Sequence, residues 1–146
     1  MASTGDRNDP YASFNFIVQI DGVDAGAFSE VTGLENDTDV VEYRNGNDLG
    51  AKRKLPGLTK LPNITLKRGF TKDTALWDWR KGVLSGAIER KNGTISLLNE
   101  AREPARRFHF TNGWPAKWQG PAFHAGNSEV AIETLEIACE SIELEQ

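Results

Sequence analysis

Apolar and polar residues alternate along several short runs of this chain, and each run predicts a β-strand with one buried face. The clearest run is Phe14–Asp21, in which four apolar residues alternate with polar ones and Ile17 is the exception. Asn63–Gly69 and Arg106–Thr111 alternate in the same way. Weaker runs predict strands over Ala27–Leu34, Thr38–Tyr43 and Glu89–Leu98, the last with a bulge or turn at Asn92-Gly93.

A single helix is predicted at about residues 71–85. Thr71 and Asp73 offer capping oxygens at its start, and Gly86 is suited to end it. The apolar residues that recur at helical spacing between them are Leu76, Trp79 and Val83. No second segment has so clear a start and stop. One helix beside many short strands predicts a small β-barrel or sandwich with one covered end.

The last segment, Glu129–Glu145, fits two periods. Its β-branched residues favour a strand, but in strand phase the apolar face switches near Thr134, which requires a bulge or burial on both faces. A helix is indicated by the spacing of Ala131, Leu135, Ala138 and Ile142. Periodicity alone slightly favours the helix.

Arg44–Leu61 has little periodicity and predicts a long loop between two strands. It contains three glycines, one proline and the basic run Lys52–Lys54. Long loops without structure are uncommon inside compact domains and are usually functional. This one is either a solvated surface loop or an arm that becomes ordered against a neighbouring molecule. The arm is favoured because exposed apolar side chains need cover, and the loop has three of them, Leu55, Leu58 and Leu61.

Composition predicts one globular domain over residues 1–146. Of these residues 38% are hydrophobic and 26% charged, which is typical of a folded chain. The formal net charge of -4 disfavours general nucleic-acid binding. A single cysteine allows no internal disulfide and suits a cytoplasmic origin. Residues 1–10 predict a flexible N-terminal arm, without a signal peptide, and no apolar run is long enough to cross a bilayer.

No motif in the chain points to catalysis, a cofactor or a metal. His109, His124 and Cys139 lack both the spacing of metal ligands and a local motif for a nucleophile with its base. The glycine-rich part of Arg44–Leu61 does not join a strand to a helix, so it does not predict a phosphate-binding loop. The basic clusters lack interleaved exposed aromatic residues, which single-stranded nucleic acids need. The sequence therefore predicts a protein that is not an enzyme.

Short runs that follow one another through nearly the whole chain carry a family resemblance. They are Asp9-Pro10-Tyr11, Phe14-Asn15-Phe16, Phe28-Ser29-Glu30-Val31, Gly33-Leu34, Glu42-Tyr43-Arg44, Gly46-Asn47-Asp48, Arg53–Leu58, Asn63–Gly69, Leu76-Trp77 with Trp79, Arg90–Gly93, Trp114–Trp118 and Asn127–Leu135. In this order they resemble the tail tube proteins of contractile-tailed bacteriophages and of related phage-derived contractile injection systems. The runs around Leu55, Ile64 and Trp114 are the specific ones.

The resemblance implies a mainly β fold, a β-barrel-like antiparallel sandwich with one flanking α-helix, and it makes Glu129–Glu145 a strand. Proteins of this family form hexameric rings that stack into a hollow inner tube. The tube lies inside a contractile sheath, is driven through a target envelope when the sheath contracts, and conveys cargo or DNA. They are structural proteins, so no catalytic, cofactor or metal residue is carried over.

The resemblance also implies a role for the loop at about 44–61, because the matching loop of the family reaches the adjacent ring. We expect this stacking loop to be poorly ordered in a lone subunit and ordered in the tube. The family usually has two adjacent glycines where this chain has Gly46-Asn47, a difference in loop geometry. The expected self-assembly residues are Arg44, Asn47, Asp48, Lys52, Arg53, Lys54, Leu55 and Leu58.

The expected partners are copies of the same chain, the sheath protein, and baseplate and tube-terminator proteins. Cargo or DNA would pass through the lumen, and no stable membrane association is expected. Assembly is expected in the bacterial cytoplasm, as part of a virion or injection particle. The alternative within the family is a baseplate-proximal tube initiator that forms one ring. A small hydrolase using Cys139 with either histidine, and a nucleic-acid-binding module, are the alternatives from other classes.

Overall fold

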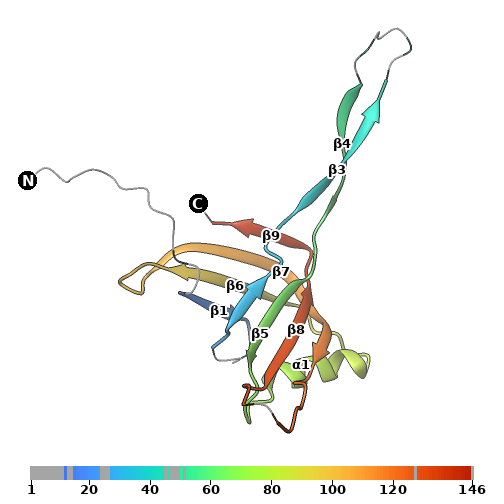
Figure 1. Cartoon of the computed structure of the whole chain (residues 1–146). Coiled ribbons are helices and arrows are strands. Elements are labelled where there is room, and N and C mark those ends of the chain that lie inside the picture. The colour runs from blue at the N-terminus through green and yellow to red at the C-terminus, as the bar shows by residue number, and fades with distance from the viewer. Residues whose placement is uncertain are drawn as a thin grey trace, which may run out of the picture.

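The fold is built from antiparallel strands with one short helix. The computed structural model describes residues 12, 15–23, 27–44, 46, 50, 52–126 and 128–145. Figure 1 shows the elements in these ranges, which are β1 (Phe16–Ile20), β2 (Glu30–Thr32), β3 (Asp37–Tyr43), β4 (Arg53–Lys60), β5 (Ile64–Gly69), α1 (Ala75–Leu84), β6 (Lys91–Leu98), β7 (Pro104–Gln119), β8 (Ile132–Ala138) and β9 (Ser141–Leu144).

Seven strands form a body of two layers that share strand β7. The first layer has the order β1-β6-β7-β9, and the second has the order β7-β8-β5-β2. The first half of β7 pairs with β6 and β9, and the second half pairs with β8. Every pairing is antiparallel, so the predicted mainly β antiparallel sandwich with one flanking helix is confirmed.

The strand β7 passes from one layer to the other at Asn112 and Gly113. Asn112 has a φ of 52°, in the left-handed region, and the register with β8 shifts between Pro115 and Lys117. A Cβ atom at Gly113 would lie 2.6 Å from Cε1 of Phe110 and 2.8 Å from a methyl carbon of Ile137. A glycine is therefore required where the backbone bends against the core.

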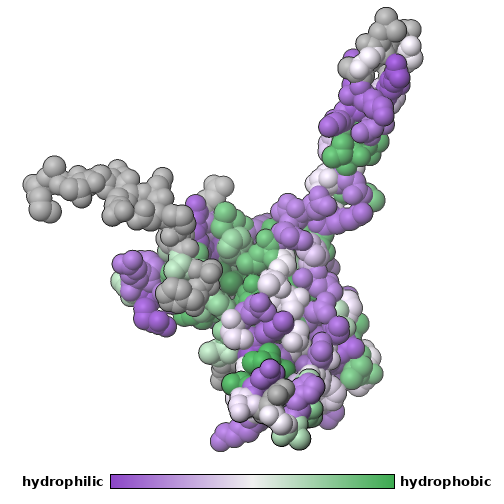
Figure 2. Space-filling model, in the orientation of Figure 1, coloured by the Kyte–Doolittle hydropathy of each residue, from purple (hydrophilic) through white to green (hydrophobic). Residues whose placement is uncertain are grey.

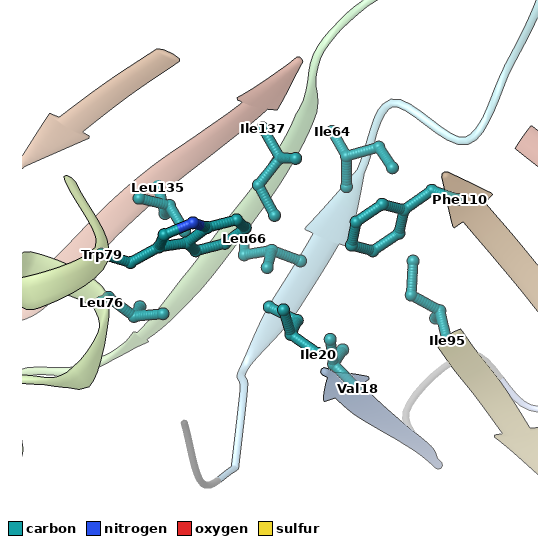
Figure 3. Close-up of a cluster of buried hydrophobic side chains, with 10 residues drawn as sticks. All are labelled: Val18, Ile20, Ile64, Leu66, Leu76, Trp79, Ile95, Phe110, Leu135 and Ile137. Carbon is teal, nitrogen blue, oxygen red and sulfur yellow. The ribbon is translucent and has the colours of Figure 1, made fainter. Parts of the chain in front are cut away.

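The core lies between the two layers, and both contribute to it. Figure 3 shows the side chains pointing toward one another from β1, β6 and β7 on one side and from β5, β8 and α1 on the other. Four side chains of β5 and β8 are fully buried. The cluster consists of Val18, Ile20, Ile64, Leu66, Leu76, Trp79, Ile95, Phe110, Leu135 and Ile137.

The helix α1 begins four residues after the predicted start at about residue 71 and ends at Leu84, close to the predicted end. Asp73 accepts a hydrogen bond at Oδ1 from the backbone N–H of Ala75, at 3.0 Å, and Gly86 ends the helix with a φ of 89°. Leu76 and Trp79 are buried in the core, and the Trp79 indole N–H donates to the carbonyl of Glu89 at 2.9 Å. The helix is thus held to the body by its apolar face and by hydrogen bonds from Trp79 and from Arg80, whose guanidinium donates to the carbonyl of Pro115 at 2.9 Å.

The C-terminal segment forms two strands, as the family resemblance predicted. β8 lies between β5 and β7, and β9 pairs with β7 after a break at Cys139 and Glu140. The helix that periodicity slightly favoured is wrong. Burial alternates regularly along β8, but the buried phase includes the charged Glu133 and the other phase includes Ile132, so the apolar residues alone do not show the alternation. Two shorter predictions are also refined: β2 covers three residues of Ala27–Leu34, and a bulge lies beside Gly93.

The predicted loop at 44–61 is wrong in its second half. Arg53–Lys60 is the strand β4, which pairs with β3 in a separate two-stranded sheet. All eight of its residues are exposed, so neither face is selected for apolar side chains and no alternation marks it as a strand. Pro56 and Gly57 concealed it further, since both are uncommon in paired strands. Part of the remaining loop, and the N-terminal arm at 1–10, lie outside the described residues.

A buried ion pair continues the apolar row of the second layer. Arg68 and Glu133 are directly opposite each other in the β5–β8 register, and each is 3% exposed. Their side chains form an ion pair, Glu133 also accepts from the Trp118 indole N–H at 3.0 Å, and Arg68 contacts Asp73 at 3.2 Å. The pair therefore joins β5, β7 and β8 to the start of α1.

Removing one member of this pair is expected to destabilise the fold strongly. Glu133→Leu removes the carboxylate that pairs with the buried Arg68 guanidinium, at a cost of about 3–5 kcal/mol in the free energy of unfolding. Urea unfolding measures this cost. The double variant Arg68→Met with Glu133→Leu should recover most of it, because no buried charge then lacks a partner.

The exposed pair between Lys67 and Glu30, at 3.2 Å, is the matched control. Glu30→Gln should change the free energy of unfolding by no more than about 1 kcal/mol, because exposed ion pairs contribute little. Equal losses from Glu30→Gln and Glu133→Leu would contradict the importance assigned to the buried pair.

Side-chain contacts of Glu145 add to the backbone pairing that joins the C-terminal strand β9 to β7. Glu145 lies 2.9 Å from Nε2 of His109 and 3.7 Å from the guanidinium of Arg107. The hydrogen bond with His109, followed by the positive charge of Arg107, lowers the pKa of the Glu145 carboxyl below its ordinary value. The ionised form of Glu145 therefore holds the end of the chain against β7.

Acid is expected to loosen β9 before the rest of the body. Because the pKa of Glu145 is lowered in the folded state, its stabilisation is complete above the ordinary glutamate pKa of about 4.3. It is lost as the pH falls through the lower folded value. Amide exchange in β9, measured relative to β8, should accelerate in that window, and Glu145→Gln should exchange rapidly already at neutral pH. The same acid response in both proteins would refute this assignment.

Candidate assembly surface

The strands β3 and β4 form a ribbon that projects from one end of the body (Figure 1). In this ribbon, residues 37–43 pair with residues 53–60, from Asp37 opposite Lys60 to Tyr43 opposite Arg53. Eight residues of strand extend for about 25 Å. Within the described ranges no further strand pairs with the ribbon, so both of its edges are open.

The ribbon carries more apolar surface than a solvated hairpin needs. Five large apolar side chains on it are between 47% and 76% exposed. They are Val40, Val41, Tyr43, Leu55 and Leu58. Figure 2 shows hydrophobic, green atoms among purple ones along the projection. A two-stranded hairpin without a packed face is at best marginally stable in water, so this surface indicates a partner that covers it.

The far half of the ribbon is basic. Between Arg44 and Lys54 the sequence has four basic residues and one acidic residue, Asp48. Lys52 pairs with Glu42 at 3.3 Å and Lys60 with Asp39 at 3.3 Å, and all four side chains are exposed. Such exposed pairs contribute at most about 1 kcal/mol each, so they align the strands weakly and leave the positive charge available to a partner.

The structure brings most of the predicted self-assembly residues together on this ribbon. Arg44 follows β3 and Lys52 precedes β4, and both are exposed. Four predicted residues lie on β4 itself, namely Arg53, Lys54, Leu55 and Leu58. Asn47 and Asp48 lie outside the described residues. The six described members of the predicted set therefore lie together at one end of the molecule.

Sequence reasoning missed the residues that β3 contributes to the same surface. Val41 lies opposite Leu55, and Val40 lies opposite Pro56. The alternation of Thr38–Tyr43 predicted a strand, but not its pairing with residues 53–60. The signal that could have revealed a ribbon is the mirrored pattern of β3 and β4, in which Glu42 faces Lys54 and valines face Leu55 and Pro56.

The candidates for catalysis lie in ordinary structural settings. His109 is hydrogen-bonded to Thr94 at 3.0 Å and to Glu145, and His124 lies in an exposed loop. Cys139 is partly buried against the core, and this burial raises the pKa of its thiol. A raised pKa keeps the thiol protonated at neutral pH, whereas a catalytic cysteine needs a thiolate. The geometry therefore gives no support to the hydrolase alternative.

In the ranges given above, no three His, Cys, Asp or Glu side chains are grouped as they would be to hold a metal ion. Among the described residues, no helix has the length and the apolar character that crossing a membrane requires.

Comparison with known families gives one match that spans almost the whole chain. The model of the T4-like virus tail tube protein gp19 family matches residues 12–143. No curated protein sequence matches the chain.

Solved structures of contractile injection systems contain similar chains. A chain of the PVC sheath–tube complex of an extracellular contractile injection system, in the extended state, is 30% identical with a TM-score of 0.84, and the match covers 94% of this chain and 93% of that one. A chain in the tube-terminating cap of the anti-feeding prophage is also 30% identical with a TM-score of 0.84, and the match covers 99% of each.

A more distant likeness shows the same fold. Hcp1 from Flavobacterium johnsoniae is 17% identical with a TM-score of 0.57, and the match covers 90% of this chain and 94% of Hcp1. At this sequence identity the similarity shows a common fold and does not show a common function. The overall fold is therefore common to proteins whose sequences have largely diverged.

Proposed function

The chain belongs to the T4-like virus tail tube protein family, and we propose that it forms hexameric rings that stack into a hollow tube. It is a structural subunit of the inner tube of a contractile tail or injection system. The observation that carries the proposed mode of assembly is the ribbon, whose apolar and basic surface has no cover in a single subunit.

Ring closure is supported by the open margins of the body. Within the described residues, β1 and β2 each end a layer without a further strand beside them. Between them lies an apolar groove of about 650 Å³, whose lining includes Phe16, Phe28, Val31, Leu34 and Phe108. A ring needs a head-to-tail interface in which unlike patches meet. The occupant of this groove is the neighbouring copy in the ring, which continues the sheets and covers the groove.

Stacking is supported by the length and position of the ribbon. The ribbon extends away from one end of the body, and its strand β4 continues along the chain into β5 of the body (Figure 1). A copy in the next ring is the partner that lies within its reach. Docking there covers the five exposed apolar side chains and stabilises a hairpin that is marginal alone.

The proposed partners beyond the chain itself are a sheath, a baseplate and a tube terminator. Chains similar to this one come from a sheath–tube complex, from tube terminators and from a baseplate of contractile injection systems. We infer that the tube is assembled in the bacterial cytoplasm and conveys cargo or DNA through its lumen when the sheath contracts. Kinship with structural tube proteins supports a role without catalysis.

The single-ring initiator is not favoured over the main tube. The family match and the sheath–tube neighbour both fit a repeating tube subunit. Electron microscopy of the purified protein is the direct test. We expect hollow tubes with sixfold symmetry in cross-section. Rings that never stack would favour the initiator, and a compact monomer at every concentration would refute the proposal.

Reversing charge on the ribbon is expected to block stacking and leave the fold intact. Arg53→Glu with Lys54→Glu changes the charge of the far half of the ribbon by four units and alters no core residue. The variant should keep its thermal unfolding midpoint and form rings without tubes, as seen by electron microscopy and sedimentation. Arg102→Glu with Arg106→Glu, on exposed positions of the body, is a control of equal charge change. Tubes of normal length from the ribbon variant would contradict the role given to it.

The ribbon is expected to be protected only in the assembly. In a lone subunit its open edges and uncovered side chains should allow amide exchange within seconds to minutes, because such regions open at little free-energy cost. In the tube the same amides should exchange at least about a hundredfold more slowly. The amides of β5 and β8 serve as the internal control, since they are buried in both states. Equal protection of the ribbon in monomer and tube would count against docking.

A further inference from the structure

A small aromatic cleft lies between the start of α1 and the ends of β5, β7 and β8. Its volume is about 230 Å³, and its lining is formed by Phe70, Thr71, Asp73, Thr74, Trp77, Trp118 and Glu133. The ring centroids of Trp77 and Trp118 are 4.9 Å apart at 59°, and those of Phe70 and Trp118 are 6.4 Å apart at 56°. Phe70 and Trp77 are 44% and 37% exposed, so an incoming group reaches their rings.

The charges around this cleft favour a cation. Glu133 lies at its buried side, and Asp73 lies at its rim. Arg68 neutralises one of these two carboxylates, so one formal negative charge remains beside three aromatic rings. An aromatic face attracts an ammonium or guanidinium group, by about 0.5–1 kcal/mol when exposed and about 2 when water is excluded. The cleft is therefore shaped for the basic side chain of a partner.

The cleft and the ribbon lie at opposite ends of the body. β4 ends at Lys60, β5 begins at Ile64, and Phe70 of the cleft follows the last residue of β5. Because β5 is six residues long, it separates the two features by about 20 Å. In Figure 1 the ribbon rises from one end, while α1 lies near the other. Copies stacked in one direction thus bring the ribbon of one toward the cleft of the next.

We propose that the aromatic cleft of each copy receives a basic side chain from the ribbon of a copy in the adjacent ring, and that Lys54 is the residue that enters it. This inference rests on the proposed stacking into a tube, and it names the surface that receives the ribbon. Lys54 is exposed on the far half of the ribbon, and its apolar stem suits the aromatic walls while its ammonium group meets the carboxylates. The match combines cation–aromatic attraction with opposite charge.

Replacing the accessible walls of the cleft tests this contact. Phe70→Ala with Trp77→Ala should leave rings intact and lower the ring-to-ring association constant by about tenfold or more for each lost contact. Leu84→Ala, on the same helix and 61% exposed, is the matched control and should form tubes of normal length. Thermal unfolding checks that the variants remain folded. Tubes of normal length from the folded cleft variant would overturn the inference.

Two further measurements connect the cleft to Lys54. A double-mutant cycle combines Lys54→Ala with the cleft variant. The two losses in ring-to-ring association free energy should be strongly non-additive, because both changes remove the same contact. In a Cys139→Ser background, Lys54→Cys with Phe70→Cys should give ladders of cross-linked copies in tubes treated with a short bis-maleimide. Lys54→Cys with Leu84→Cys should give none. Additive losses and an absence of ladders would also overturn the inference.

The outcomes separate this inference from the proposed function. Wild-type protein that forms no tubes refutes the tube itself. Wild-type tubes, together with cleft variants that stack normally and fail to bind purified sheath, would assign the cleft to the sheath and refute docking of the ribbon there. Lys54→Arg should stack almost as well as the wild type, whereas Lys54→Met should not, because the cleft selects positive charge.

Discussion

The pairing of β5 with β8 is the contact on which the remaining structure depends. Ile64 and Leu66 meet Leu135 and Ile137 in a fully buried row, which forms the floor of the core. The row ends at the buried ion pair of Arg68 with Glu133, and this pair ties β7 and the start of α1 to the same two strands. The two strands thereby fix the direction along which the ribbon leaves one end and the aromatic cleft opens at the other.

Sequence reasoning succeeded where one face of a strand or helix packs on the core. Strand β1 and helix α1 were predicted from their periods, because burial selects apolar side chains at regular spacing. It failed for β4, where exposure on both faces removes that selection. It also did not reveal that Arg68 is buried. A charged residue is expected to be exposed unless a partner is known, and the partner of Arg68 lies on the distant strand β8.

The C-terminal strands and the candidate site show different limits. Periodicity slightly favoured a helix over β8, and only the family resemblance corrected this, because the charged Glu133 occupies a buried position of the strand and Ile132 lies on the other face. For the ribbon, the basic residues and leucines of β4 were predicted to form an assembly surface, and the structure places them together on one strand. Val40 and Val41 of β3 were not, because their contribution depends on pairing between segments that are distant in sequence. The aromatic cleft is lined by residues from four separate elements, so no local sequence pattern predicts it.

The placement of the ribbon at one end of the body gives any filament of these subunits a polarity. In the proposed tube, one terminus exposes the basic ribbons of its last ring. The other terminus exposes the unoccupied aromatic clefts of its first ring. Proteins that begin or finish such a filament consequently need opposite chemistries, and neither can substitute for the other. Growth then proceeds with a defined leading face, so the orientation of the tip that meets a target is set by the first ring laid down.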